Sequence, residues 1–139
     1  MASAKKYACD TSVAVAALDS SHEFHAVCRK VAVANRPVLA GHAAFETYSV
    51  LSRLPGSQAV STDVVGQLMT RAFPGRCWLT AEQHDALLRR LPSLAIIGGA
   101  VYVALVGEAA RANGRLLLTR DVRARRVYEA LEVAYEFVD

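Results

Sequence analysis

Three carboxylate side chains occupy positions from which they could act together on one ligand. Asp10 follows a short apolar segment, and Asp121 follows the strongly apolar segment 115–119 with one residue between. If these segments are neighbouring strands of an open parallel sheet, both carboxylates project into the crevice beyond the carboxyl ends of the strands, where ligands bind in such sheets. Each residue taken singly is more typical of a helix N-cap.

Glu46 occurs inside a predicted helix rather than at the end of a strand. Its neighbours Ala43, Ala44, Phe45 and Tyr48 are apolar, so its carboxylate is expected at a packed boundary. A buried carboxylate without a partner is costly and requires a cation or strong hydrogen-bond donors. A glutamate at a helix edge that pairs with an arginine remains an equally open interpretation.

Together, Asp10, Glu46 and Asp121 are suited to a hard divalent ion such as Mg²⁺ or Mn²⁺. Such an ion positions and activates a water molecule and neutralises the charge that develops on a phosphodiester. Without a cation, crowded carboxylates repel one another and raise one another's pKa values. The set therefore predicts a metal ion or a cationic partner.

Hydroxyl, imidazole and thiol side chains are weaker candidates for chemistry. Thr11, Ser12 and Thr119 have no histidine and acid spaced as a nucleophilic triad, so we expect them to orient the carboxylates or the metal's water through hydrogen bonds. His22 and His25 form an HxxH pair without a third ligand nearby, which favours surface histidines. The three cysteines form no CxxC pair, which favours reduced, buried thiols.

Arginines cluster near the C-terminus of the chain. A solvated helix face accounts for such a cluster more simply than a phosphate-binding surface does, and the net charge of +3 is only mildly basic. The cluster gains meaning only if an active site lies beside it. Its members are Arg111, Arg115, Arg120, Arg123, Arg125 and Arg126.

Short apolar segments alternate with helical patterns along the chain. The predicted strands cover residues 6–9, 36–39, 76–79, 115–119 and 134–138. The predicted helices cover residues 12–18, 22–34, 42–54, 61–73, 81–91, 100–112 and 121–131. This alternation predicts one α/β domain over residues 1–139, with a parallel sheet of four to five short strands flanked by helices.

The composition is that of a globular protein, with 53% hydrophobic and 21% charged residues among 139. The longest uncharged segment, 91–107, is interrupted by Pro92 and by Gly98-Gly99, and it is shorter than the roughly 20 apolar residues that a membrane span requires. No apolar region follows the two lysines near the start, so no secretory signal is expected. We expect a cytoplasmic protein without a membrane anchor.

Four segments, in this order, resemble those of VapC toxins, which are PIN-domain ribonucleases. The first, CDTSVAVAAL, contains Asp10, and the second, AFETYSVLSRLP, contains Glu46. The third is GGAVYVAL, and the last, LLLTRDVRARRVYEALEV, contains Thr119 and Asp121. The resemblance implies that Asp10, Glu46 and Asp121 bind the metal and that Thr11, Ser12 and Thr119 support them.

The resemblance also implies a biological role. VapC toxins are homodimeric endoribonucleases that depend on Mg²⁺ or Mn²⁺ and belong to type II toxin–antitoxin systems. They halt translation by cutting tRNA or ribosomal RNA, and a VapB-type antitoxin restrains them by placing a C-terminal segment, often with an arginine, in the acidic crevice. In this setting Arg120, Arg123 and Arg125 are candidates for contact with RNA phosphates.

Val103 departs from the family pattern, which has an aspartate at this position of GGAVYVAL. Valine supplies no oxygen ligand, and Glu108 lies about 140° further round the helix, so it cannot replace the missing carboxylate. We expect weak metal affinity and reduced cleavage. Two origins are open: a natural member of the family has lost the aspartate, or the valine is a detoxifying substitution. The otherwise intact pattern favours the detoxifying substitution. The alternative function is a module that binds RNA or the antitoxin without cutting.

Overall fold

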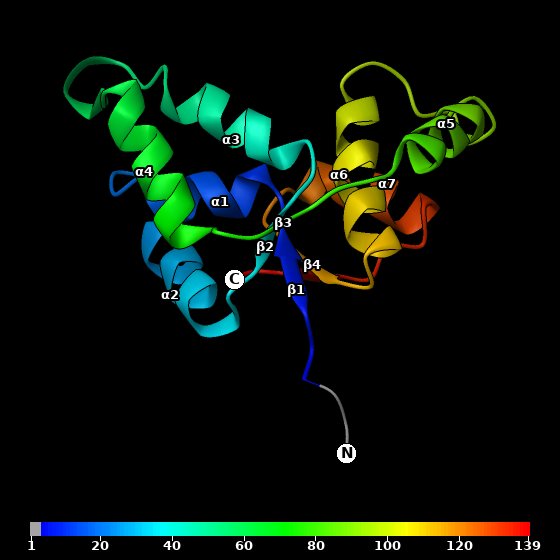
Figure 1. Ribbon diagram of the computed structural model, residues 1–139, viewed down its shortest axis with the longest axis horizontal. Helices are drawn as coiled ribbons and strands as arrows, with labels where there is room; N and C mark the ends of the chain where they lie inside the picture. Colours follow the sequence, from blue (N-terminus) through cyan, green and yellow to red (C-terminus); the bar gives the residue numbers. More distant parts are fainter. Residues whose placement is uncertain (1–3) are drawn as a thin grey trace.

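The computed structural model describes residues 4–139, which form a five-stranded, fully parallel sheet in the order β3-β2-β1-β4-β5 (Figure 1). Parallel strands require long crossover connections, and helices supply them here. The predicted α/β class with a parallel sheet is confirmed. The strands are β1 (Tyr7–Cys9), β2 (Val38–Ala40), β3 (Arg76–Cys77), β4 (Leu116–Thr119) and β5 (Tyr135–Phe137).

Helices cover both faces of the sheet, as Figure 1 shows. One face carries α1, α2 and α4 together with most of α3, and the other carries α5, α6 and α7. The helices are α1 (Thr11–Leu18), α2 (His25–Asn35), α3 (Ala43–Leu51), α4 (Thr62–Ala72), α5 (Ala81–Arg90), α6 (Ala100–Ala112) and α7 (Arg125–Ala130), and the short 3₁₀ turns are η1 (Gly56–Gln58) and η2 (Val122–Ala124).

Alternation along the strands divides the core in two. On β1, Ala8 packs under α5–α7 while Cys9 packs under α1–α4, and on β4 Leu117 and Leu118 divide in the same way. Successive side chains of a strand point to opposite faces, so a parallel sheet covered on both faces is apolar at consecutive positions. The three cysteines are buried and unpaired, as predicted.

The element boundaries show where local patterns were insufficient. The helix 100–112 is confirmed at both ends, and Thr80 begins α5 with the capping box that it forms with Gln83. The predicted helix 121–131 is wrong at its start: Asp121 accepts a hydrogen bond from the Arg123 backbone, a 3₁₀ turn follows, and the α-helix begins only at Arg125. The helix predicted over residues 22–34 begins three residues later than predicted, at His25.

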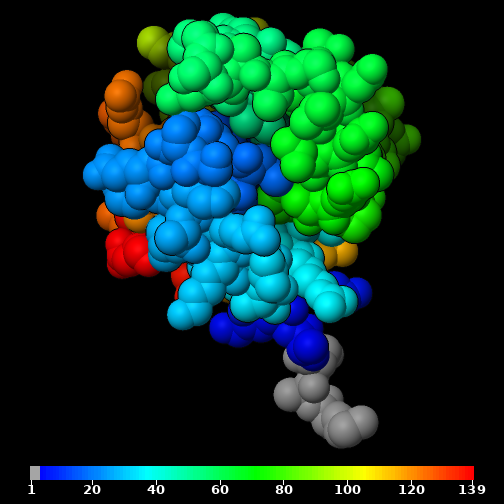
Figure 2. All heavy atoms as spheres, turned by 90° about the vertical axis from the view of Figure 1, so that its left-hand side faces the viewer, coloured from blue at the N-terminus to red at the C-terminus, as the bar shows by residue number. Residues whose placement is uncertain are grey.

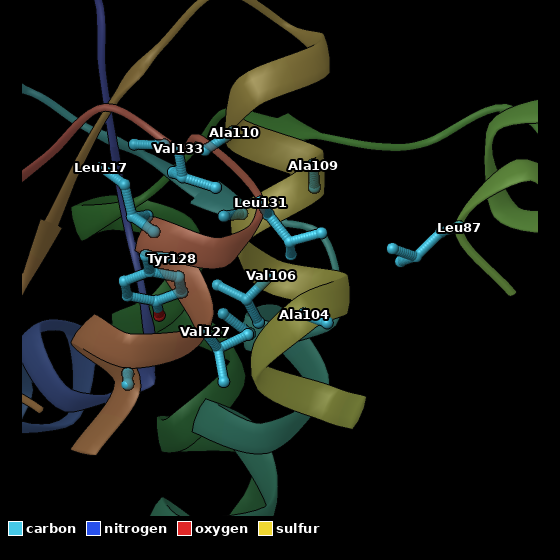
Figure 3. Packing of buried hydrophobic residues seen from close by; sticks show 14 of the residues in the cluster. Leu87, Ala104, Val106, Ala109, Ala110, Leu117, Val127, Tyr128, Leu131 and Val133 are labelled. Atoms are coloured by element: carbon cyan, nitrogen blue, oxygen red, sulfur yellow. The ribbon is translucent and has the colours of Figure 1, made fainter. Parts of the chain in front are cut away.

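Gly107 allows α6 to pack closely on the C-terminal segment. A Cβ at this glycine would lie 2.8 Å from Cδ1 of Tyr128 and 3.2 Å from Cγ2 of Val133. Figure 3 shows the Tyr128 ring in this core, close to Leu117, Val106 and Val127. The glycine weakens the helix locally, but it provides the space that the aromatic ring occupies.

The helices of residues 4–139 include none with the length and apolarity needed to cross a bilayer. The longest, α6, has 13 residues.

Gly107→Ala is expected to reduce the free energy of unfolding by about 1–3 kcal/mol, because the added methyl group overpacks the core against Tyr128. Urea denaturation followed by circular dichroism measures the change. Gly66→Ala in α4 is the matched control, since an added Cβ meets nothing within 4 Å there and alanine is favoured over glycine by about 0.5–1 kcal/mol in helices. Equal unfolding energies for Gly107→Ala and the parent chain would contradict this packing argument.

Candidate functional site

The three acidic residues follow three neighbouring strands. Asp10 follows the central strand β1, whose partners are β4 on one side and β2 on the other. Asp121 lies two residues after β4, and Glu46 lies on α3, the helix that follows β2. The Asp10 backbone N–H donates to the carbonyl of Leu118, which anchors it at this edge. The parallel topology therefore brings the carboxylates to the same end of the sheet, as predicted.

Asp10 is buried, with 4% of its surface exposed, and neutral groups donate to both of its carboxylate oxygens. Oδ1 accepts from the Ser12 hydroxyl at 2.5 Å and from the Val13 backbone at 3.4 Å, and Oδ2 accepts from the Tyr128 hydroxyl at 2.9 Å. Among residues 4–139 no basic side chain forms an ion pair with it. Burial raises the pKa of Asp10, and hydrogen bonds from Ser12, Thr119, Tyr128 and Val13 oppose that rise.

Asp10 and Asp121 are both N-caps, the role that is more typical of each residue taken singly. Asp10 is the N-cap of α1, since its side chain accepts from the Val13 N–H. Asp121 is the N-cap of η2, where its side chain accepts from the Arg123 N–H at 3.0 Å. A capping carboxylate uses only part of its acceptor capacity, so capping leaves lone pairs for a ligand.

Tyr128 is the site residue that sequence reasoning missed, because an aromatic residue in a helical pattern is most simply a core or dimer-interface side chain. It is indeed buried, with 1% exposure, but its hydroxyl reaches Asp10 across 118 positions of sequence. Burial raises the pKa of the Tyr128 phenol far above its ordinary value, and the negative charges of Asp10, Asp121 and Glu46 raise it further. The phenol therefore stays protonated and donates to Asp10.

The hydroxyls of Ser12 and Thr119 link the ends of β1 and β4. Ser12 accepts from the backbone N–H of Arg120 at 2.9 Å while it donates to Asp10. Thr119 is fully buried and accepts from the backbone N–H of Asp121 at 3.0 Å. These contacts are the ones expected of side chains that orient acidic groups.

Glu46 is half-buried and pairs with no arginine in the described part of the chain. Its nearest cationic candidate is His42, one turn earlier on the approach to α3, with Nε2 4.0 Å from Oε1. Burial raises the pKa of Glu46, and the charge of Asp10 raises it further, whereas His42 and the Thr11 hydroxyl lower it. Asp10 and Glu46 are thus close enough for the charge of one to act on the other.

The oxygen donors of this site are of the type that a hard divalent ion such as Mg²⁺ prefers, with water completing its coordination. Within residues 4–139 no three acidic, histidine or cysteine side chains lie close enough to form a complete ion cage. Mg²⁺, however, is usually held by one or two carboxylates together with waters and substrate phosphates. The buried Thr11 hydroxyl oxygen has no hydrogen-bond partner of good geometry, and Asp10 is a buried acid without a counter-charge. Both features suit a cation with its bound water.

Position 103 supplies no oxygen. Val103 lies in the first turns of α6, half-buried against the cluster that contains Tyr128. Glu108, further along α6, does not replace it: Arg111 donates to its Oε2 at 3.0 Å, and Arg90 of α5 lies 3.8 Å away. The prediction that Glu108 faces elsewhere is confirmed, since its carboxylate joins α6 to α5.

The arginine cluster is largely used within the protein. The Arg120 guanidinium lies 3.5 Å from the centre of the Phe24 ring and donates to the carbonyl of Val138. The Arg125 guanidinium lies 4.3 Å from the centre of the Phe137 ring. Arg120 and Arg125 are thus half-buried structural residues. By contrast, the exposed Arg123 follows Asp121 closely, and its predicted contact with RNA phosphates stays a prediction.

The surface positions predicted for His22 and His25 are confirmed only in part. His84 is exposed, but His22, His25 and His42 are half-buried. His22 Nδ1 accepts from the Phe24 N–H at 3.1 Å, and His25 Nδ1 lies 2.8 Å from the Ala16 carbonyl, so the HxxH pair has structural partners.

A cavity of about 650 Å³ between α2 and α4 lies away from the acids. Residues that precede or begin β2 and β3, among them Pro37 and Gly75, contribute to its lining. They lie at the amino ends of the strands, opposite the end that carries the acids. Figure 2 views the face formed by α1, α2 and α4, where this hollow lies between α2 and α4. It therefore does not belong to the carboxylate site.

Curated relatives match the chain over most of its length. Ribonuclease VapC27 of Mycobacterium tuberculosis is 40% identical over 126 residues, which cover 91% of this chain and 92% of the relative. Ribonuclease VapC40 of the same species is 43% identical over 131 residues, which cover 93% of this chain and 96% of the relative. No protein-family model matches the chain.

A solved structure shares the fold. VapBC2 from Rickettsia felis, crystallised bound to a DNA fragment from the promoter of the pair, matches with a TM-score of 0.66 and 15% sequence identity. The match covers 96% of this chain and 98% of that one. The predicted fold is confirmed.

Asp10→Asn is expected to stabilise the metal-free protein at neutral pH. Because burial raises the pKa of Asp10, the folded state holds its proton more tightly than the unfolded state does. The associated stability is present below about pH 4, the ordinary pKa of aspartate, and is lost as the pH rises through the raised value. Asparagine has nearly the same side-chain shape as aspartate and carries no charge. Melting temperatures in EDTA should favour the variant at neutral pH, and the difference should shrink as the pH falls.

Asp85→Asn removes an exposed carboxylate from α5 and controls for the change in net charge. If Asp10→Asn melts below the parent chain at neutral pH in EDTA, the buried charge is not a destabilising feature and the argument fails.

Tyr128→Phe is expected to reduce the free energy of unfolding by about 1–3 kcal/mol, because Asp10 Oδ2 loses a buried donor while the ring packing is retained. Tyr135→Phe removes the exposed hydroxyl that donates to Glu129 and should change stability by about 0.5 kcal/mol or less. Chemical denaturation of both variants gives the comparison. Equal losses for the two would show that the Tyr128 hydroxyl has no special role at Asp10.

Proposed function

Because the chain belongs to the VapC family of ribonucleases, we propose that it is the toxin of a VapBC toxin–antitoxin pair and that its site takes Mg²⁺ or Mn²⁺ to cleave RNA. The observation that supports this proposal most directly is the Asp10 carboxylate. It is buried at the end of the central strand, without a basic partner in the described chain, and the charges of Asp10, Asp121 and Glu46 all act on its hydrogen-bond donor Tyr128. A cation relieves that arrangement, and phosphodiester hydrolysis is chemistry that such a cation supports.

Asp10, Glu46 and Asp121 would hold the ion partly through bound waters, because these side chains do not form a close cluster of three ligands in the described chain. When bound, the ion would polarise a water and neutralise charge on the phosphodiester. Ser12 and Tyr128 fix the direction of the Asp10 carboxylate through hydrogen bonds to both oxygens. Glu46 is more accessible than Asp10, so its carboxylate is the one better placed to accept a proton from the attacking water.

We assign RNA as the substrate, with tRNA or ribosomal RNA as the target class, and cytoplasmic action on the translation apparatus. The relatives are named ribonucleases. The exposed Arg123, two residues after Asp121, provides sequence-independent attraction for phosphates. A VapB-type antitoxin is the proposed partner; the fold relative is a VapBC complex. An arginine of such a partner would pair with the carboxylates in place of the metal. We also propose a homodimer.

Val103 favours a second candidate function, a module that binds RNA or antitoxin and does not cut. The valine lies on α6 where the family has an aspartate, and residues 4–139 contain no cluster of three close acidic ligands. A site with fewer carboxylates binds a divalent ion less tightly. We therefore propose that the parent chain cleaves weakly.

Val103→Asp is expected to raise Mn²⁺ affinity by about tenfold or more, because ion affinity in oxygen sites follows the number of charged ligands. Isothermal titration measures the affinity, and incubation with total RNA followed by gel analysis measures metal-dependent cleavage. Val33→Asp adds the same charge at an exposed position of α2 and should alter neither measurement.

Val103→Asp with Asp10→Asn in the same chain should lose the gained cleavage. If Val103→Asp binds Mn²⁺ no better than the parent and cuts no RNA, the nuclease proposal fails and the binding-module alternative is favoured.

A further inference from the structure

A small pocket of about 130 Å³ lies next to Glu46 and is lined by aromatic and imidazole rings. Gly41 directly follows β2 and adopts a positive φ of 51°, which turns the chain into α3. The four rings that line the pocket come from three parts of the chain. They are His42 and Phe45 at the start of α3, Trp78 just after β3, and His84 on α5.

The floor of the pocket is apolar and closely packed. Leu105 and Ala109 of α6 contribute to it, and a Cβ at Gly41 would lie 3.2 Å from Cβ of Ala109. Such a floor suits a flat, weakly polar ring, while the imidazoles of His42 and His84 offer hydrogen-bonding groups at its edge.

The rings around this pocket are unusually open to solvent. Phe45 is 65% exposed and Trp78 is 48% exposed, with ring centres 5.9 Å apart. Beside them, His42 stacks on Tyr102 at 5.0 Å between ring centres, and Tyr102 is 51% exposed. Exposed apolar rings gathered at one place are typical of binding surfaces. Aromatic side chains of this kind stack on unpaired nucleobases in proteins that bind single-stranded RNA.

His42 connects the pocket to Glu46. His42 lines the pocket and also lies 4.0 Å from the Glu46 carboxylate, and Phe45 directly precedes Glu46 on α3. A base held in the pocket therefore brings the sugar–phosphate backbone of its own nucleotide or the next one to the edge of the crevice.

We propose that this pocket binds one unpaired nucleobase of the RNA substrate, stacked against Phe45 and Trp78, and so helps to select which phosphodiester enters the carboxylate site. This inference rests on the proposed ribonuclease function and adds a binding subsite for the substrate. A second copy of the chain is the competing occupant for an apolar surface. The hollow shape, the imidazole edges and the direct link to Glu46 favour the base.

The single tryptophan of the chain reports on the pocket directly. Short single-stranded oligoribonucleotides containing all four bases, added to the full chain in EDTA, are expected to quench Trp78 fluorescence, whereas a duplex of the same length should not. Phe45→Ala should weaken binding of the single strand by about tenfold. Tyr48→Ala, which removes another exposed aromatic ring from α3 outside the pocket lining, should leave binding unchanged.

Several results would overturn the proposal. Equal quenching by duplex and single strand, or unchanged binding by Phe45→Ala, would exclude a base-binding pocket. If Trp78 fluorescence depends on protein concentration without RNA and Phe45→Ala abolishes self-association in sedimentation, the surface binds a second copy instead. Two further measurements distinguish failure of the pocket proposal from failure of the ribonuclease proposal: fluorescence anisotropy of labelled RNA, which reports binding, and RNA cleavage by Val103→Asp. If RNA binds and Val103→Asp cleaves it while Phe45→Ala binds as the parent does, only the pocket proposal fails. If neither binding nor cleavage is observed, the ribonuclease proposal fails as well.

Discussion

The burial of one carboxylate at the end of the central strand is the constraint on which the site depends. Asp10 caps α1, bonds to Ser12 and Tyr128, and has almost no contact with solvent. Neutral donors lower the cost of its charge but do not remove it, since burial still raises its pKa. Under the proposed function, a divalent ion or a partner's guanidinium would supply the positive charge that Asp10 lacks.

The core and the site are joined through Tyr128. Its ring fills the space beside Gly107 on α6, and its hydroxyl leaves that core to reach Asp10. Because the ring is held on all sides, the hydroxyl has little freedom, and the direction of the carboxylate follows from the packing of α6 against α7. Ser12 performs a similar task from the other side, where it connects β1 to the chain after β4.

The rim of the crevice combines charge and aromatic surface. Arg120 and Arg125 serve the packing of Phe24 and Phe137 and so contribute little free positive charge, whereas Arg123 is exposed. On the α3 side the surface is aromatic, with Phe45 next to Glu46. In the proposed function, Arg123 would attract the phosphates of any RNA sequence, whereas the rings on the α3 side would stack only on unpaired bases.

The sequence by itself determined the alternation of strands and helices, the parallel sheet and the three acidic positions, because apolar periodicity and residues that follow strands are local patterns. It also identified the anomaly at Val103. Only the tertiary structure decided that β1 lies between β2 and β4, that the Tyr128 hydroxyl reaches Asp10, and that Arg120 packs on an aromatic ring. These outcomes depend on pairings between residues far apart in the chain, and no local pattern encodes which distant partner a buried hydroxyl or guanidinium meets.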